Sequence, residues 1–311
     1  MRDRFGRPIT GLRISVTDKC NLACFYCHNE GFSSRGERLM SAEEIGKIVE
    51  LAVEFGVRKI KLTGGEPLLR EDIIEVLRAI PKPPIEEVSM TTNGTLLAGL
   101  AQDLKEAGLD RVNMSLDTLE PETYALITGK SVLEDVLAGV ESALKAKLKP
   151  LKINMVLLDG VNDGEVDRMF EYASSEGAIL QLIELLQTPL NERSFAGCHL
   201  DLDEIERRFG ERALSVETRY TMHARRKYLL PEGEVEFVRP MHNSEFCMHC
   251  TRLRLTHDGY LKPCLMRNDN LVDVLSCLRE GSADGVRKAF KEAILRRAPH
   301  FKVLPQPSLA Q

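Results

Sequence analysis

The chain has 311 residues, of which 43% are hydrophobic and 29% charged, a balance typical of a globular protein with a sizeable core. Its net charge of -5 gives no overall electrostatic case for a nucleic-acid or membrane partner. No run approaches the roughly 18 apolar residues of a membrane span, and the start, MRDRFGRPITGLRISV, lacks the apolar core of a secretory signal, so we expect a cytoplasmic protein.

The first 190 residues alternate between segments with strand and helix patterns. Strands are predicted at 12–16, 58–63, 86–93, 110–117, 151–158 and 179–186. Helices are predicted at 41–55, 70–80, 96–108, 132–146 and 163–177. Alternation of this kind indicates βα units joined by right-handed crossovers, and therefore a parallel sheet.

Six such units are fewer than the eight of a closed barrel. The sequence therefore predicts an α/β fold, a partial (β/α)6 TIM-like barrel that is open at one side. Ligand sites of parallel sheets gather at the carboxyl ends of the strands. A cysteine-rich loop follows the first strand and so lies at that end.

The pattern loosens after residue 190. A short helix is expected within 191–210, irregular β-structure over 218–240, a hairpin over 252–265 and a final helix near 282–297. We therefore expect a barrel over 1–190, followed by a C-terminal segment over 191–311.

Six of the eight cysteines fall into two tight triplets. These are Cys20, Cys24 and Cys27, and Cys247, Cys250 and Cys264. In a reducing compartment such clusters favour metal binding over disulfides. For the lone thiols Cys198 and Cys277 we expect a packing or surface role.

The first triplet has the spacing C-x3-C-x2-C. Structural zinc takes four protein ligands, so a zinc site here would need a further ligand such as His28. A 4Fe–4S cluster held by three cysteines instead keeps one iron without a protein ligand. Such an iron can chelate the amino and carboxylate groups of S-adenosylmethionine.

This loop, with Tyr26 before its last cysteine, resembles that of the radical S-adenosylmethionine enzymes. LTGGEPLL at 62–69 follows the second strand, where that family has a glycine-rich motif that contacts the methionine amino group. Glycine lacks Cβ, so Gly64 and Gly65 let backbone approach a ligand closely. The resemblance implies a partial (β/α)6 barrel in which reduction of S-adenosylmethionine by the cluster yields a 5′-deoxyadenosyl radical.

The second triplet has two interpretations on spacing alone: zinc completed by His249 or His242, or a second 4Fe–4S cluster with a free iron. Its surroundings, FCMHCTRLRLTHDGYLKPCL at 246–265, closely resemble the C-terminal cluster segment of the GTP 3′,8-cyclase family. The likeness includes KIKLTGGEPLL, NMSLDT and KINMVLLDGVND, and so spans nearly the whole chain. In that family the second cluster binds the guanine base of GTP.

The resemblance also implies site residues. The matching GTP positions are Arg13, Lys61, Thr91, Lys152, Arg252 and Arg254, and the matching S-adenosylmethionine positions are Tyr26, Gly65, Ser115 and Leu186. The charge of a triphosphate requires several cations. Arg252 and Arg254 lie two apart, so they project to one face of an extended strand. No catalytic acid or base is predicted.

The implied reaction begins molybdenum cofactor biosynthesis. The radical takes the 3′ hydrogen of GTP, and the sugar attacks C8 to give (8S)-3′,8-cyclo-7,8-dihydroguanosine 5′-triphosphate. The implied partners are a cyclic pyranopterin monophosphate synthase, which consumes the product, and an external electron donor; a homodimer is one possible assembly. This sequence differs from common family members at Lys61 and Gln181, where arginine is usual, at Leu186, often a methionine, and in its ending, VLPQPSLAQ, which lacks a Gly-Gly tail.

Overall fold

The computed structural model describes residues 1–31, 38–188 and 190–301. The ending at 303–311, where the family's Gly-Gly tail would stand, lies outside the described residues.

Six parallel strands form the centre of the molecule. They are β1 (Gly11–Ser15), β2 (Lys59–Thr63), β3 (Glu87–Thr92), β4 (Arg111–Ser115), β5 (Lys152–Leu157) and β6 (Ile179–Glu184). Each pairs in parallel with the next along the chain. This confirms the six predicted strands and the α/β fold with a partial barrel.

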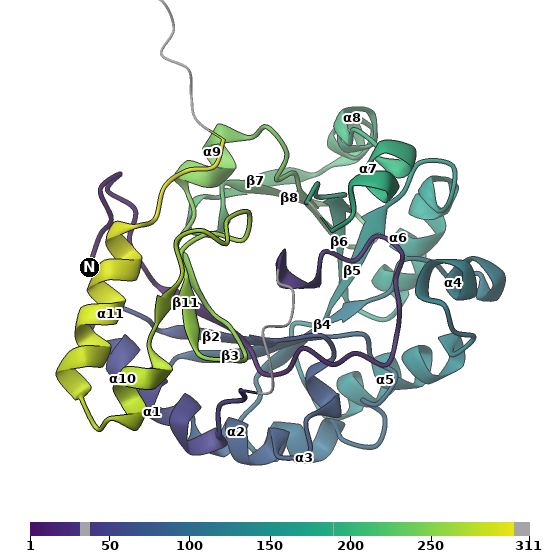
Figure 1. Ribbon diagram of the computed structural model, residues 1–311. Helices are drawn as coiled ribbons and strands as arrows, with labels where there is room; N and C mark the ends of the chain where they lie inside the picture. The colour runs from purple at the N-terminus through teal and green to yellow at the C-terminus, as the bar shows by residue number, and fades with distance from the viewer. Residues whose placement is uncertain (32–37, 189, 302–311) are drawn as a thin grey trace, which may run out of the picture.

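Helices cover the outer face of this curved sheet (Figure 1). The predicted ones are α1 (Ala42–Val53), α2 (Ile73–Ala79), α3 (Ala101–Glu106), α5 (Leu133–Lys145) and α6 (Val166–Ser175). The hydroxyl of Ser41 accepts a hydrogen bond from the Glu44 backbone amide, and the Glu44 carboxylate accepts one from the Ser41 backbone amide. This capping box starts α1. Helix α3 begins at residue 101 rather than 96, because turns occupy 95–100.

Helix α4 (Pro121–Thr128) was not predicted. Its signals are short-range ones: proline at its first position and Gly129 at its end, with φ of 74°. Proline suits the first turn of a helix and glycine the left-handed residue after it. The eight-residue segment is too short for a clear apolar period.

The C-terminal part of the chain extends both edges of the same sheet. β10 (Arg252–Leu255) pairs in parallel with β1, and β11 (Tyr260–Lys262) and β12 (Val272–Asp273) follow antiparallel. At the other edge β9 (Glu234–Val238) pairs in parallel with β6, followed by β8 (Arg225–Leu229) and β7 (Ser215–Arg219). The predicted hairpin is confirmed, whereas the expected irregular stretch over 218–240 holds regular antiparallel strands.

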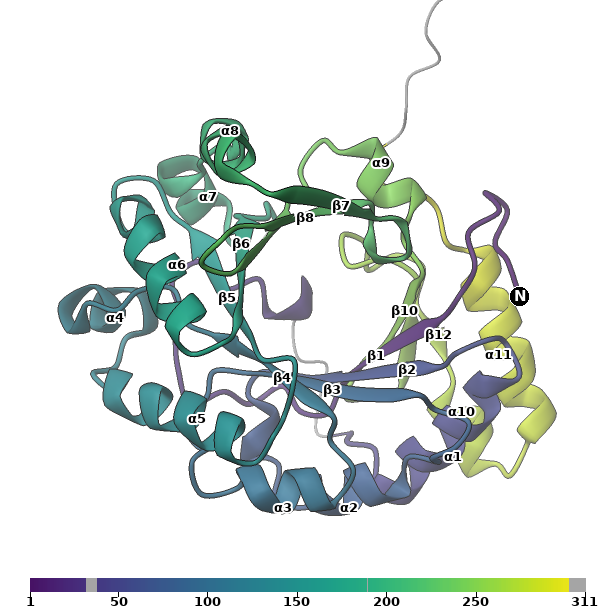
Figure 2. The same ribbon diagram turned by 180° about the vertical axis from the view of Figure 1, so that it is seen from behind.

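The resulting sheet of 12 strands curves around a central space (Figure 2). Five further helices flank it: α7 (Glu192–Cys198), α8 (Asp203–Arg212), α9 (Ser244–Met248), α10 (Leu275–Arg279) and α11 (Ala283–Leu295). Two helices thus begin in the region where one was expected. The expected final helix is α11, and its Phe290 ring stacks on Phe55 of the barrel with centroids 5.2 Å apart.

Strand alternation decides which face of the sheet is apolar. Leu12 and Ile14 of β1 are buried toward the helices, whereas Gly11, Arg13 and Ser15 are only half-buried. The same parity puts Lys61 of β2 on the inner face, because successive side chains of a strand point to opposite faces. The barrel interior is therefore polar and can hold a charged ligand. Among the residues that the structure describes, none of the helices is long and apolar enough to cross a membrane.

Candidate active site

A cavity of about 600 Å³ lies inside the curved sheet. Ten of the predicted site residues line it: Arg13, Lys61, Thr91, Lys152, Leu186, Cys247, Cys250, Arg252, Arg254 and Cys264. They come from β10, β1, β2, β3 and β5 and from segments that follow β6, precede β10 and follow β11. The sequence-based grouping of the second triplet with the GTP positions thus corresponds to one physical cavity.

The cavity is strongly cationic. Eleven lysine and arginine side chains line it against three glutamates, so it suits a polyanion. Burial lowers the pKa of Lys61 well below its usual value, and the nearby charges of Arg111 and Arg13 lower it further. The pKa of Arg252 is lowered in the same way, by burial first and then by Arg225. A bound anion would relieve this mutual repulsion.

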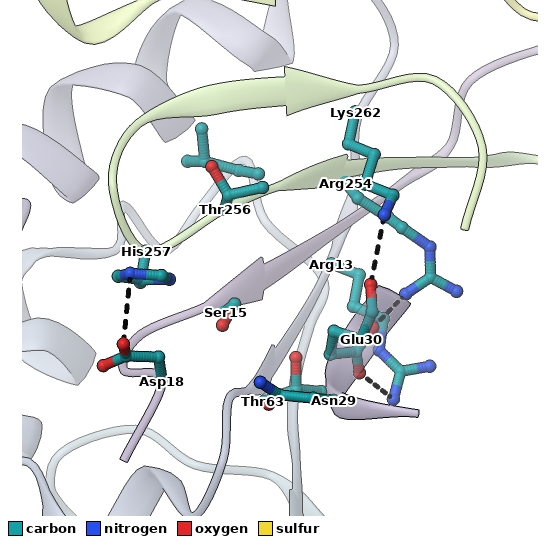
Figure 3. Close-up of a pocket in the computed structure, with 11 residues that line it drawn as sticks. Arg13, Ser15, Asp18, Asn29, Glu30, Thr63, Arg254, Thr256, His257 and Lys262 are labelled. Atoms are coloured by element: carbon teal, nitrogen blue, oxygen red, sulfur yellow. Dashed lines mark hydrogen bonds and ion pairs between the residues drawn. The ribbon is translucent and has the colours of Figure 1, made fainter. Parts of the chain in front are cut away.

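Glu30 pairs with two of the residues that are predicted to bind the substrate (Figure 3). Its carboxylate forms an ion pair with Arg13, at 2.9 Å, and another with Arg254. The loop that carries it is held by Lys262, whose Nζ donates to the Gly31 carbonyl at 2.8 Å. Burial opposes ionisation of Glu30, but the two arginines outweigh it and lower the pKa to about 2. The carboxylate is therefore charged at neutral pH, and sequence reasoning missed it.

The first triplet lies in the loop after β1. Its three thiols are free; burial raises the pKa of each, and the proximity of Cys20 raises those of Cys24 and Cys27 further. Backbone amides of Leu22 and Asn29 donate to the sulfurs of Cys20 and Cys27 at 3.4 and 3.3 Å. Such bonds stabilise thiolates that ligate iron–sulfur clusters.

This loop adjoins the cavity, because His28, next to Cys27, lines it. In the described part of the chain, no three His, Cys, Asp or Glu side chains converge as ligands of a single ion. The thiolates of a cubane cluster bind separate irons and so lie farther apart than the ligands of one ion. The second triplet lines the cavity and His28 of the first triplet's loop lines it too, so both cysteine segments lie at one cavity.

The GGEP motif holds this loop against the sheet. A Cβ on Gly65 would lie 2.1 Å from the backbone oxygen of Lys19, which no side chain tolerates. The Gly65 amide donates to the Thr17 carbonyl at 2.9 Å and the Glu66 amide to Lys19 at 2.7 Å. The glycine is thus required for packing against the cysteine loop, independently of any ligand.

Tyr26 is anchored by a buried carboxyl. Its hydroxyl donates to Asp117 at 2.5 Å, and the other Asp117 oxygen accepts from the Val156 amide at 2.8 Å. Burial raises the pKa of Asp117 to about 6. Tyr26, Gly65 and Ser115 do not line the cavity of about 600 Å³, so the structure does not group these S-adenosylmethionine positions with Leu186.

The second triplet is surrounded by arginines. Arg7 donates to the Cys247 carbonyl at 2.7 Å, and Arg297 donates to that of Cys250. Burial alone would raise the pKa of the Cys250 thiol, but Arg297, the Arg252 amide and the charges of Arg252 and Arg7 lower it overall. Cationic surroundings favour the thiolate form that binds metal.

Lys152 lies in a buried charge network. It is 3% exposed and its Nζ is 2.5 Å from a carboxylate oxygen of Glu236. Glu236 also pairs with Arg219 at 2.5 Å and accepts a hydrogen bond from Gln181 at 2.7 Å. Arg219 and Arg225 line the cavity but were not predicted. Neither β7 nor β8 has an apolar alternation that could have indicated them.

The chain matches two family models: "Radical SAM superfamily" over 14–173 and "Molybdenum Cofactor Synthesis C" over 178–303. It is 51% identical over 303 residues to "Probable GTP 3',8-cyclase" of Methanocaldococcus jannaschii, covering 97% of this chain and 100% of that protein. A protein of the same name from Pyrococcus horikoshii is 52% identical over 307 residues, with 96% and 97% covered. SuiB of Streptococcus suis bound to S-adenosylmethionine superposes with a TM-score of 0.67 at 18% identity, covering 90% of this chain and 68% of SuiB, which shows a shared fold.

Proposed function

Because this chain belongs to the GTP 3′,8-cyclase family of radical S-adenosylmethionine enzymes, we propose that it cyclises GTP to (8S)-3′,8-cyclo-7,8-dihydroguanosine 5′-triphosphate. This is the first step of molybdenum cofactor biosynthesis. The observation that carries the proposal is the cationic cavity, which the second cysteine triplet lines and which the loop of the first triplet adjoins.

The chain's own residues bind and orient the reactants. Cys20, Cys24 and Cys27 would hold the cluster that, with S-adenosylmethionine bound, supplies hydrogen-atom abstraction. The remaining work of the protein is to hold C3′ of the ribose and C8 of the base close together, and such positioning supplies a large part of a rate enhancement.

The substrate contacts divide between two regions of the cavity. Cys247, Cys250 and Cys264 would hold a second 4Fe–4S cluster that binds the guanine base. Arg13, Lys61, Lys152, Arg252 and Arg254 supply charge for the triphosphate, and their convergence on one cavity supports this assignment. Thr91 adds a hydroxyl at the same wall.

The S-adenosylmethionine contacts remain proposals of the same kind. Tyr26, held by Asp117, lies in the cysteine loop, Gly65 lies against that loop, and Ser115 ends β4. Leu186, in the cavity wall, would contact the adenosyl group. We further propose a cytoplasmic location, an external electron donor and a synthase that consumes the product.

Anaerobic reconstitution tests the proposal. Two clusters require about eight irons per chain, and release of 5′-deoxyadenosine should depend on GTP and not on the other nucleoside triphosphates. Release of 5′-deoxyadenosine that does not depend on GTP would favour a related enzyme that acts on a peptide or another small molecule. No release at all would favour a non-enzymatic metal protein, and zinc at either triplet would contradict the proposal.

A further inference from the structure

We propose that Arg225, at the start of β8, is a further phosphate-binding residue of the cavity. The inference rests on the proposed function, because it names a contact for the triphosphate of GTP. Arg225 lies outside every motif that pointed to the substrate positions. It would bind phosphate oxygens from the side of the cavity opposite β1 and β10.

Arg225 is buried but lacks a counter-ion. Its side chain lines the cavity, and the residue is only 8% exposed. Its Nε is buried without a hydrogen-bond partner. Within the described residues no carboxylate forms an ion pair with it, and its Cζ lies over the Phe246 ring, 5.9 Å from the ring centroid. A buried charge left unpaired is costly unless a ligand supplies the partner.

The nearest carboxylate is already engaged. Glu236 uses one oxygen for Lys152 and Arg219, each at 2.5 Å, and the other for Gln181 at 2.7 Å. Glu236 attracts Arg225 only at longer range, and burial with the charges of Arg13 and Arg219 lowers the pKa of Arg225 to about 10. The guanidinium is still charged at neutral pH, so its charge is left for a ligand to balance.

Arg225 faces other unpaired cations across the cavity. It comes from β8 and Arg252 from β10, near opposite ends of the sheet order, yet the charge of Arg225 contributes to the lowered pKa of Arg252. A space bounded on two sides by guanidinium groups suits a multiply charged anion. Phosphate oxygens match the planar donor fork of arginine, whereas guanine is neutral and S-adenosylmethionine, with its sulfonium, carries a net positive charge.

Arg225 and the residue after it lie on opposite faces of β8. His223 and Ala224, just before β8, both have positive φ, at 69° and 52°. The His223 ring lies 4.2 Å from that of Phe246, centroid to centroid. The next residue, Arg226, lies on the opposite face of the strand; its side chain is 60% exposed and pairs with Glu206 at 3.6 Å. Neighbouring arginines on one strand thus give a test residue and a matched control.

Equilibrium binding to the anaerobic, cluster-loaded enzyme tests the proposal, with GTP, GDP, GMP and guanosine as ligands. Arg225→Met should weaken GTP binding about 10- to 100-fold, the range expected for losing a hydrogen bond to a charged group. It should leave guanosine binding unchanged, since guanosine lacks phosphate. Arg226→Met should bind all four ligands as the wild type does. Arg225→Lys keeps the charge but not the two parallel donors of the guanidinium, and should show a smaller loss of GTP affinity than Arg225→Met.

The other outcomes overturn the proposal in distinguishable ways. Equal losses for GTP and guanosine in Arg225→Met would assign Arg225 a structural role, and unchanged GTP binding would remove the contact. If Arg225→Met does not fold, Arg225→Lys provides the test. Wild-type GTP affinity in Arg225→Lys would overturn the proposed contact between the guanidinium of Arg225 and phosphate. A wild-type enzyme that binds other nucleoside triphosphates but not GTP would refute the proposed function, while a loss specific to Arg225 would still support the phosphate contact.

Discussion

Replacing Glu30 by glutamine should tighten substrate binding while it destabilises the ligand-free enzyme. The Glu30 carboxylate pairs with Arg13 and Arg254, both proposed to bind GTP. The triphosphate must therefore displace Glu30 or share the arginines with it. Glutamine keeps the shape of the side chain but removes the negative charge, so both guanidinium groups become available to phosphate.

The magnitude follows from the shift in the Glu30 pKa. The pKa falls from 4.5 to about 2, which corresponds to about 3 kcal/mol in favour of the ionised form in the folded protein. The carboxylate is only 16% exposed, so solvent screens this attraction little. About 3 kcal/mol is an upper limit for the gain in GTP binding free energy. We expect GTP affinity to rise roughly tenfold, or by about 1.4 kcal/mol, because GTP and Glu30 can share the two arginines in the wild-type enzyme.

The pH dependence has a definite sign. A carboxyl group with a depressed folded-state pKa stabilises the fold above its unfolded value of 4.5, and that contribution is lost as the pH falls toward 2. Thermal unfolding of the cluster-free chain should therefore show Glu30→Gln to be less stable than the wild type at pH 7. The difference should shrink as the pH falls below 4.5.

GTP binding to the anaerobic enzyme provides the decisive measurement. Glu54→Gln is the control, because Glu54 pairs with Arg287 on the exposed surface at 2.9 Å and should leave GTP affinity unchanged. Equal or weaker GTP binding by Glu30→Gln would show that Glu30 orients the two arginines for substrate instead of competing with it.

Three other substitutions have clear expected outcomes. Cys24→Ser should abolish 5′-deoxyadenosine release and lower the iron content of anaerobic protein by about half, since the second cluster keeps its ligands; unchanged release would exclude the first triplet as the radical site. Gly65→Ala should greatly reduce cluster incorporation, because the added Cβ would lie 2.1 Å from the backbone of the cysteine loop. Gly99→Ala is the control and should incorporate iron normally, because there is open space around Gly99. Equal iron content in the two variants would contradict the packing role of Gly65. Glu236→Gln should lower the unfolding free energy by about 3–5 kcal/mol at pH 7, because it leaves Lys152 unpaired. The difference from wild type should shrink above about pH 8, because burial lowers the pKa of Lys152 to about 8. A loss of stability that does not change with pH would contradict this cause.

The barrel could be predicted because its signals are local and periodic. β-Strands and helices alternate with clear apolar patterns, and the capping box at Ser41 marks a helix start. The spacing of Arg252 and Arg254 likewise predicted that both project to one face, and both line the cavity in the structure. Strands β7 to β9 have weaker signals: β7 is exposed along almost its whole length, so no apolar alternation marks it.

The counter-charges of the site could not be predicted, because their partners are distant in sequence. Glu30 meets Arg254 across 224 residues, and Lys152 meets Glu236 across 84. Sequence patterns show that a strand points a cation inward, but they do not show which cations the fold neutralises. Arg225 was missed for the same reason, because its significance depends on the engagement of Glu236 elsewhere.

Some of the cations that line the cavity are paired with glutamates, and others are not. Glu30 neutralises part of the charge of Arg13 and Arg254, and Glu236 does the same for Lys152 and Arg219. Among the described residues, Lys61, Arg225 and Arg252 line the cavity without a carboxylate partner. Without the two glutamates, these seven of the eleven cavity cations would have no carboxylate partner among the described residues and would repel one another. With them, the ligand-free protein tolerates its cavity and retains an excess positive charge that a polyphosphate can neutralise, so the same pairing that stabilises the fold also selects for the charge of the substrate.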